Sequence, residues 1–172
     1  MLEQKIKDAY LAILAEEMVP AMGCTEPIAL AYASAKGREV LGEDATNIVA
    51  RCSGNMIKNV RCVTIPNSGG MNGIEVACIL GALVGDASRR MEVLEAVTDA
   101  QRTLAKELLD GNMCKVEYLD SEIPLHFIIE LHSKMHTASV EVKYAHTNIV
   151  SISKDGEIVF SEEEHGTFSC NE

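Results

Sequence analysis

The segment LHFIIELHSKMHTASVEVK, residues 125–143, decides the fold class of this chain. Apolar and polar side chains alternate on both sides of the turn-like triplet Ser133-Lys134-Met135, and a period of two predicts paired strands. The same alternation extends in both directions, with a second turn signal at Lys154-Asp155-Gly156. The expected strands span 114–119, 125–132, 136–144, 147–153 and 157–161. They predict an antiparallel meander with one polar face.

The residues before 114 show mostly helical spacing instead. Apolar side chains recur every three or four residues, and the expected helices span about 2–17, 25–41, 74–84 and 99–109. Pro20 ends the first helix, Thr25 is a plausible N-cap of the second, and Thr98 with Gln101 forms a capping box for the last. Two strands, 47–53 and 60–65, are expected between the helices. The fold class is therefore α+β, a helical N-terminal half packed on an antiparallel β-meander from the C-terminal half.

The length of 172 residues suits one domain with its own core. We expect a single α+β domain over residues 1–165. Residues 166–172 then form a tail, or the start of a linker to a C-terminal domain that this chain lacks, after an acidic stretch at 161–166.

Charge and composition exclude several classes of partner. The chain has 15 Lys and Arg against 26 Asp and Glu, a formal net charge of −11. Nucleic acid and anionic membrane surfaces both favour a basic face, so neither is expected as a partner. The N-terminus does not resemble a signal peptide and no apolar run reaches the ~20 residues of a membrane span. We therefore expect a cytoplasmic protein whose thiols stay reduced.

The six cysteines form no CxxC pair and complete no zinc pattern with the histidines. Most are expected to be small buried apolar side chains. Cys24 differs because it lies between a glycine and the expected start of a helix, where the helix N-terminus favours a thiolate. Glu26 is either an acid or base beside Cys24 or a carboxylate that only complements the helix dipole.

Two other features are less specific. The loop 66–73 contains three glycines and precedes a helix, a setting that suits a carboxylate or phosphate, although it matches no dinucleotide or P-loop spacing. His136 and His146 lie at the ends of expected strands, where each either faces a site or sits in a surface turn. No GxSxG motif supports a serine hydrolase.

Several stretches together resemble a known family. Met22-Gly23-Cys24-Thr25-Glu26-Pro27 resembles the GCTEP signature of the L-cysteine desulfidase family, which is UPF0597-type and related to the alpha domain of iron–sulfur L-serine dehydratases. Four further stretches resemble the family in the same order along the chain: 53–59, 63–70, 81–86 and 146–150.

This resemblance implies a lyase that works without pyridoxal phosphate. Family members are similar in using a [4Fe–4S] cluster with one open iron as a Lewis acid. The implied reaction is β-elimination from L-cysteine, giving pyruvate, ammonia and sulfide, or from L-serine, giving pyruvate and ammonia. By resemblance, Cys24 is the cluster ligand, and Thr25 and Glu26 are its catalytic neighbours. The implied substrate-binding residues are Asn55, Asn59, Asn67, Ser68, Gly69, Gly70, His146 and Asn148.

The chain also departs from the family. The family's other cluster cysteines lie in a C-terminal helical domain, and no other cysteine here lies in a matching motif. We therefore expect this polypeptide alone to be inactive and to hold no cluster. Its expected partners are an amino-acid substrate, the absent domain or a partner subunit, and a second copy in a homo-oligomer. The alternative is a non-enzymatic small-molecule-binding or regulatory module, whereas a pyridoxal-phosphate enzyme lacks a suitable setting for Lys36, Lys58 or Lys106.

Overall fold

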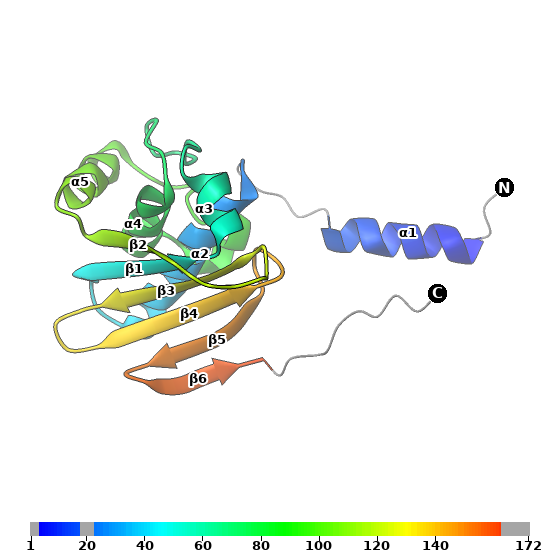
Figure 1. Cartoon of the computed structure of the whole chain (residues 1–172). Coiled ribbons are helices and arrows are strands. Elements are labelled where there is room, and N and C mark those ends of the chain that lie inside the picture. The colour runs from blue at the N-terminus through cyan, green and yellow to red at the C-terminus, as the bar shows by residue number, and fades with distance from the viewer. Residues whose placement is uncertain (1–3, 18–22, 163–172) are drawn as a thin grey trace.

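The computed structural model describes residues 4–17 and 23–162 (Figure 1). Helices and strands interleave along the chain before a run of strands completes it. The elements are α1 Gln4–Glu17, α2 Thr25–Leu41, β1 Asn47–Cys52, α3 Gly54–Val60, α4 Ile74–Val84, η1 Ala87–Glu92, α5 Asp99–Asp110, β2 Cys114–Tyr118, β3 His126–His132, β4 Thr137–Lys143, β5 Ile149–Lys154 and β6 Glu157–Ser161.

The six strands form one mixed sheet in the order β2-β1-β3-β4-β5-β6. The strands β3 to β6 are the antiparallel meander that the alternation predicts. The strand β1 lies between β2 and β3, parallel to β2 and antiparallel to β3. A strand from the first third of the chain therefore occupies the interior of the sheet.

The helices α2 and α4 pack on the sheet and on each other. The helix α2 contacts mainly β3 and β4, whereas α4 contacts β1 and β2. Their mutual approach depends on Gly81, because a Cβ at this position would lie 2.2 Å from the backbone oxygen of Ala31. Small side chains between the helices bring their backbones together, and the core of the described residues is mostly aliphatic, with Phe127 and Tyr32 as its aromatic side chains.

Most predicted elements are confirmed. The predicted helix 74–84 matches α4, and the capping box of Thr98 with Gln101 is present at the start of α5. The helix α1 ends at Glu17 as predicted, and positions 2 and 3 of that prediction lie outside the described residues. The boundary near 165 also lies outside them.

The α+β class is confirmed, two finer predictions are wrong and a third is only loosely supported. Residues 60–65 do not form a strand, because Val60 completes the short helix α3 and the following turn makes only an isolated bridge from Thr64 to Asn72. The N-cap of α2 is Cys24, one residue before Thr25. The division into a helical half and a strand half is only loosely correct, since β1 belongs to the first half and pairs in parallel with β2.

The helix α1 extends away from the rest of the molecule in Figure 1. The side chains from Gln4 to Leu14 are exposed. None of the described helices combines the length and the apolar character that crossing a bilayer requires.

Candidate functional site

The carboxylate of Glu26 gathers polar groups at the start of α2. The thiol of Cys24 donates a hydrogen bond to Oε2 of Glu26 over 3.3 Å, and the hydroxyl of Thr25 donates to the same oxygen over 3.3 Å. Cys24 is the N-cap residue but its side chain makes no capping hydrogen bond. The thiol therefore donates to the carboxylate, while the backbone N–H groups of Thr25 and Glu26 also act on its sulfur.

Two further elements bring side chains to Glu26. The amide of Asn59 in α3 donates to Oε1 over 3.4 Å. His146, in the turn between β4 and β5, lies close enough for its charge to act on the same carboxyl group. The helix α3 follows the end of β1, and the turn follows the end of β4. Because β1 and β4 both run antiparallel to β3, these two ends lie at the same edge of the sheet.

The short helix α3 is held in place by its cap. The hydroxyl of Ser53 accepts a hydrogen bond from the backbone N–H of Met56 and donates one to the backbone oxygen of Pro124 over 2.7 Å. An N-cap serine satisfies one of the free N–H groups of the first turn. Asn59 is thereby fixed on the last turn of α3, facing α2.

The three ionisable groups of this cluster influence one another. Burial favours the neutral form of Glu26, but hydrogen bonds from its own backbone N–H, from Cys24 and from Thr25, together with the charge of His146, lower the pKa of the carboxyl overall. Burial, and then the hydrogen bond and charge of Glu26, raise the pKa of the Cys24 thiol. The N–H groups of Thr25 and Glu26 at the helix N-terminus favour a thiolate as predicted, but these effects outweigh them and the pKa of the Cys24 thiol is raised overall. Burial lowers the pKa of His146, although Glu26 opposes this.

At neutral pH the cluster thus combines an ionised carboxylate, a thiol and a neutral imidazole. A neutral imidazole can accept a proton, and a neighbouring carboxylate stabilises the imidazolium that forms. A thiol that gives up its proton becomes a soft metal ligand or a nucleophile.

Cys24 is the cysteine that the resemblance implies as a cluster ligand. It is exposed, whereas Cys52, Cys78 and Cys114 are buried in the core. Burial raises the pKa of Cys52 to about 12, and the hydrogen bond to Cys78 together with burial raises that of Cys114. Cys62 is exposed in the turn after α3. Within residues 4–17 and 23–162, no group of three or more His, Cys, Asp or Glu side chains is arranged to hold a metal ion. The described residues therefore fit a cluster at one ligand and do not complete its ligand set.

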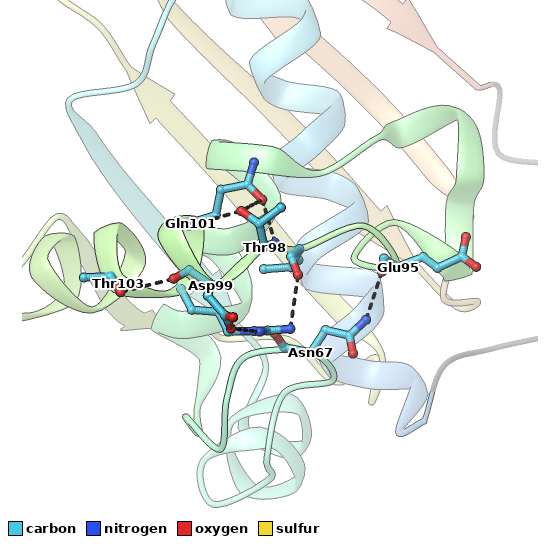
Figure 2. A network of polar contacts seen from close by, with 8 residues as sticks. Asn67, Glu95, Thr98, Asp99, Gln101 and Thr103 are labelled. Carbon is cyan, nitrogen blue, oxygen red and sulfur yellow. Dashed lines mark hydrogen bonds and ion pairs between the residues drawn. The ribbon is translucent and has the colours of Figure 1, made fainter.

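The glycine-rich loop lies beside this cluster. A Cβ at Gly23 would lie 3.2 Å from Cγ of Pro66, so the start of the loop approaches the residue before Cys24. The amide of Asn67 donates to the backbone oxygens of Leu94 and Glu95 over 3.0 and 3.2 Å, as Figure 2 shows for Glu95. Asn67 therefore secures the loop to the segment before α5.

Arg102 completes this attachment, and the sequence analysis missed it. Its Nε donates to the backbone oxygen of Asn67 over 2.6 Å, and its guanidinium also contacts the backbone oxygen of Val97 and pairs with Asp99. No sequence signal distinguishes this arginine from others on exposed helices, because its role depends on a loop 35 residues away.

The other residues implied by resemblance have varied positions. Ser68 is buried and donates to the backbone oxygen of Met71, while Gly69 and Gly70 are exposed at positive φ of 77° and 94°. Asn55 is exposed on the first turn of α3. Asn148 donates to the backbone oxygen of Lys143 and so closes the turn that carries His146. Substrate contact by these residues stays a prediction.

His136 lies at the opposite end of β4 from His146. It pairs with Asp155 over 2.7 Å and with Glu43 over 3.6 Å. It serves the turn between β3 and β4 and does not join the cluster around Glu26.

The fold and the site define an α+β domain that presents a thiol, a carboxylate and an imidazole at one edge of its sheet. Comparison with known proteins finds that this domain is similar to part of the UPF0597 proteins. The chain is 46% identical to a UPF0597 protein of Finegoldia magna over 156 residues and 44% identical to one of Lachnoclostridium phytofermentans over 151 residues. These matches cover 87% and 88% of this chain but 36% of each relative. A UPF0597 protein of Treponema denticola is 40% identical over 92% of this chain and 37% of its own.

The names of these relatives state no activity. The chain spans a little more than a third of the length of each. No family model and no solved structure matches it.

Proposed function

We propose that this domain is part of an amino-acid lyase that eliminates the β-substituent of L-cysteine or L-serine with the aid of a [4Fe–4S] cluster. The observation that carries the proposal is the meeting of three separately predicted residues at the carboxylate of a fourth, Glu26. Cys24, Glu26, Asn59 and His146 come from α2 and its cap, α3 and the turn between β4 and β5. The resemblance implies these residues from separate stretches of the sequence, and their shared location in the fold supports a common role.

In this proposal Cys24 is one ligand of the cluster. Two further thiolates come from outside the described residues, either from a region that the longer relatives possess or from a partner subunit. When bound, the cluster supplies a Lewis acid that polarises the substrate.

The other residues handle the proton and the orientation of the site. His146 accepts the α-proton as a neutral imidazole, and Glu26 stabilises the resulting imidazolium. Hydrosulfide or water leaves from the β-carbon, and the enamine product tautomerises and hydrolyses to pyruvate and ammonia. Asn59 holds the Glu26 carboxylate in place through its hydrogen bond.

The test is anaerobic expression of the complete reading frame, reconstitution with iron and sulfide, and measurement of pyruvate from L-cysteine and from L-serine. Cys24→Ala is expected to lower the bound iron and abolish pyruvate formation. His146→Gln is expected to keep the iron and lose at least about 100-fold in turnover, the usual contribution of a general base. His136→Gln is the matched control, since His136 lies at the other end of β4.

Two results would reject the proposal. One is a fully reconstituted protein that releases no pyruvate from either amino acid. The other is a Cys24→Ala variant that retains the full iron content and activity. The 172-residue polypeptide alone is expected to bind no stoichiometric cluster, which an iron assay and the visible absorbance measure directly.

A further inference from the structure

The helix α1 presents an apolar stripe that is exposed among the described residues. Ile6, Tyr10, Ile13 and Leu14 recur at the i, i+4, i+7 and i+8 positions that place side chains on one face of a helix. All four are exposed, Tyr10 by 57% and Ile13 by 54%. A soluble helix normally buries such a stripe, because helical stability comes largely from packing of the apolar face.

A second apolar surface lies uncovered on the body of the molecule. A shallow pocket of about 340 Å³ runs between α2 and the last two strands. Tyr32 and Lys36 of α2 form one side, Ile149 and Ile152 of β5 lie opposite, and Phe160 of β6 continues the apolar lining. We call this surface the β5–β6 groove.

The groove has no helix over it among the described elements. The helix α2 lies over β3 and β4 and reaches only part of β5, and no described helix makes substantial contact with β6. All five residues of β6 are exposed, including Ile158, Val159 and Phe160. An exposed apolar edge strand favours association unless another element covers it.

We propose that α1 of one chain occupies the β5–β6 groove of a second copy, and that two copies exchange these helices reciprocally. Figure 1 shows α1 directed away from its own sheet, and its stripe is exposed, so the stripe is open to a second copy. The exchange covers both exposed apolar surfaces with a single contact. It is independent of the proposed lyase activity.

The dimensions of the two surfaces agree. A helix of 14 residues is about 21 Å long, and a strand of five or six residues is about 17–20 Å long. A helix placed beside α2 on the sheet continues the helical layer, whose neighbouring axes lie about 8–10 Å apart.

The charges at the groove are compatible with α1. Lys36 already pairs with Glu39 over 2.9 Å, and the other charged residue of the pocket is Glu162. Lys7 follows Ile6 by one residue and lies beside Leu14 on the helix surface, so it can pair with Glu162 at the edge of the contact. Because the exchange is reciprocal, each dimer contains the contact twice. The doubled contact helps the buried surface area reach the roughly 1,200–2,000 Å² of a stable interface.

The absence of tryptophan from the sequence allows a direct test. Tyr10→Trp places a single fluorophore on the stripe, and its emission reports whether this face is buried. We expect blue-shifted emission relative to the urea-unfolded chain, and a mass by light scattering of about twice the monomer's 18.7 kDa.

Charged substitutions on the two surfaces then separate the possible arrangements. Ile13→Asp on the stripe and Phe160→Asp in the groove are each expected to weaken the dimer by about ten-fold or more in Kd, and Phe160→Asp is expected to return the probe to an exposed emission. Ala12→Asp, on the far side of α1 from the stripe, and Ile158→Asp, which pairs with Ser153 and so lies on the opposite face of β6 from Phe160, are the matched controls and should leave the dimer intact. Ile13 is exposed on α1 and is not part of the buried core, so its substitution leaves the core of the domain intact.

Three results would overturn the proposal. The chain could be monomeric at every concentration with an exposed probe, which would leave the groove empty. The probe could be buried in a monomer, which would mean that α1 folds back on its own chain. The dimer could survive both Ile13→Asp and Phe160→Asp, which would place the interface elsewhere.

Discussion

Gly81 is the residue at which the packing of α2 on α4 is most sensitive to one added atom. A Cβ there would lie 2.2 Å from the backbone oxygen of Ala31, 2.7 Å from its Cα and 2.8 Å from its carbonyl carbon. These are backbone atoms, so no change of rotamer can relieve the contact. The two helices must separate by about 1 Å to restore an ordinary carbon–oxygen distance.

The expected cost follows from two opposing effects. Alanine is about 1 kcal/mol better than glycine inside a helix. Overpacking of a tight core costs typically 1–3 kcal/mol and more when the backbone must move, because separated helices also lose contacts along their length. We expect Gly81→Ala to lower the free energy of unfolding by about 3 kcal/mol. For a chain of this length that corresponds to a fall in Tm of roughly 6–12 °C.

Urea denaturation followed by circular dichroism, together with a thermal melt, measures this change. Gly54→Ala is the matched control, since Gly54 is also helical and a Cβ there would meet only Tyr118, at an ordinary 3.5 Å. The control is expected to be neutral or slightly stabilising. If Gly81→Ala were as stable as the parent chain, the close approach of α2 and α4 would be refuted.

Three further predictions concern the site and its supporting loop. Glu26→Gln is expected to speed alkylation of Cys24, because the carboxylate accepts the thiol hydrogen bond and its charge raises the pKa of the thiol. Peptide mapping after iodoacetamide labelling measures the alkylation rate. An unchanged rate would contradict the contact between Cys24 and Glu26. Folding lowers the pKa of His146 below its ordinary 6.5. Between pH 6.5 and the folded pKa the unfolded chain therefore binds more protons than the folded chain. The free energy of unfolding accordingly falls as the pH decreases through this range. His146→Gln should flatten this dependence of the urea midpoint on pH, and an identical slope in both proteins would exclude the histidine as its source. Arg102→Gln is expected to cost about 1–2 kcal/mol through lost charge-assisted hydrogen bonds and to speed proteolysis within residues 66–73, whereas Lys106→Gln on the same helix should do neither.

Local signals were sufficient for the elements that depend on neighbouring residues. The limits of α4 and the capping box at Thr98 follow from residues within one turn, and both are confirmed. The helix α3 was missed although Ser53 is an ordinary N-cap, because apolar β-branched residues from Val60 onward suggested a strand. A helix of seven residues is too short for periodicity to identify it.

Contacts between residues far apart in the sequence cannot be predicted from such local signals. The parallel pairing of β1 with β2 joins residues more than 60 positions apart, and no pattern within either strand specifies it. The proximity of Cys24 to Glu26 follows from their close positions in the sequence. The approach of Asn59 and His146 to Glu26 depends on the topology of the sheet and could not be derived from the residues themselves.

The interior position of β1 has a consequence for synthesis of the chain. Both hydrogen-bonded neighbours of β1 follow it along the chain, and the nearer one, β2, begins at Cys114. At a translation rate of about 5–20 residues per second, β1 waits roughly 3–12 s before its first partner has been made. During that interval α3 and α4 are the elements already synthesised that contact β1 in the finished fold, while both hydrogen-bonding edges of the strand stay without their partners.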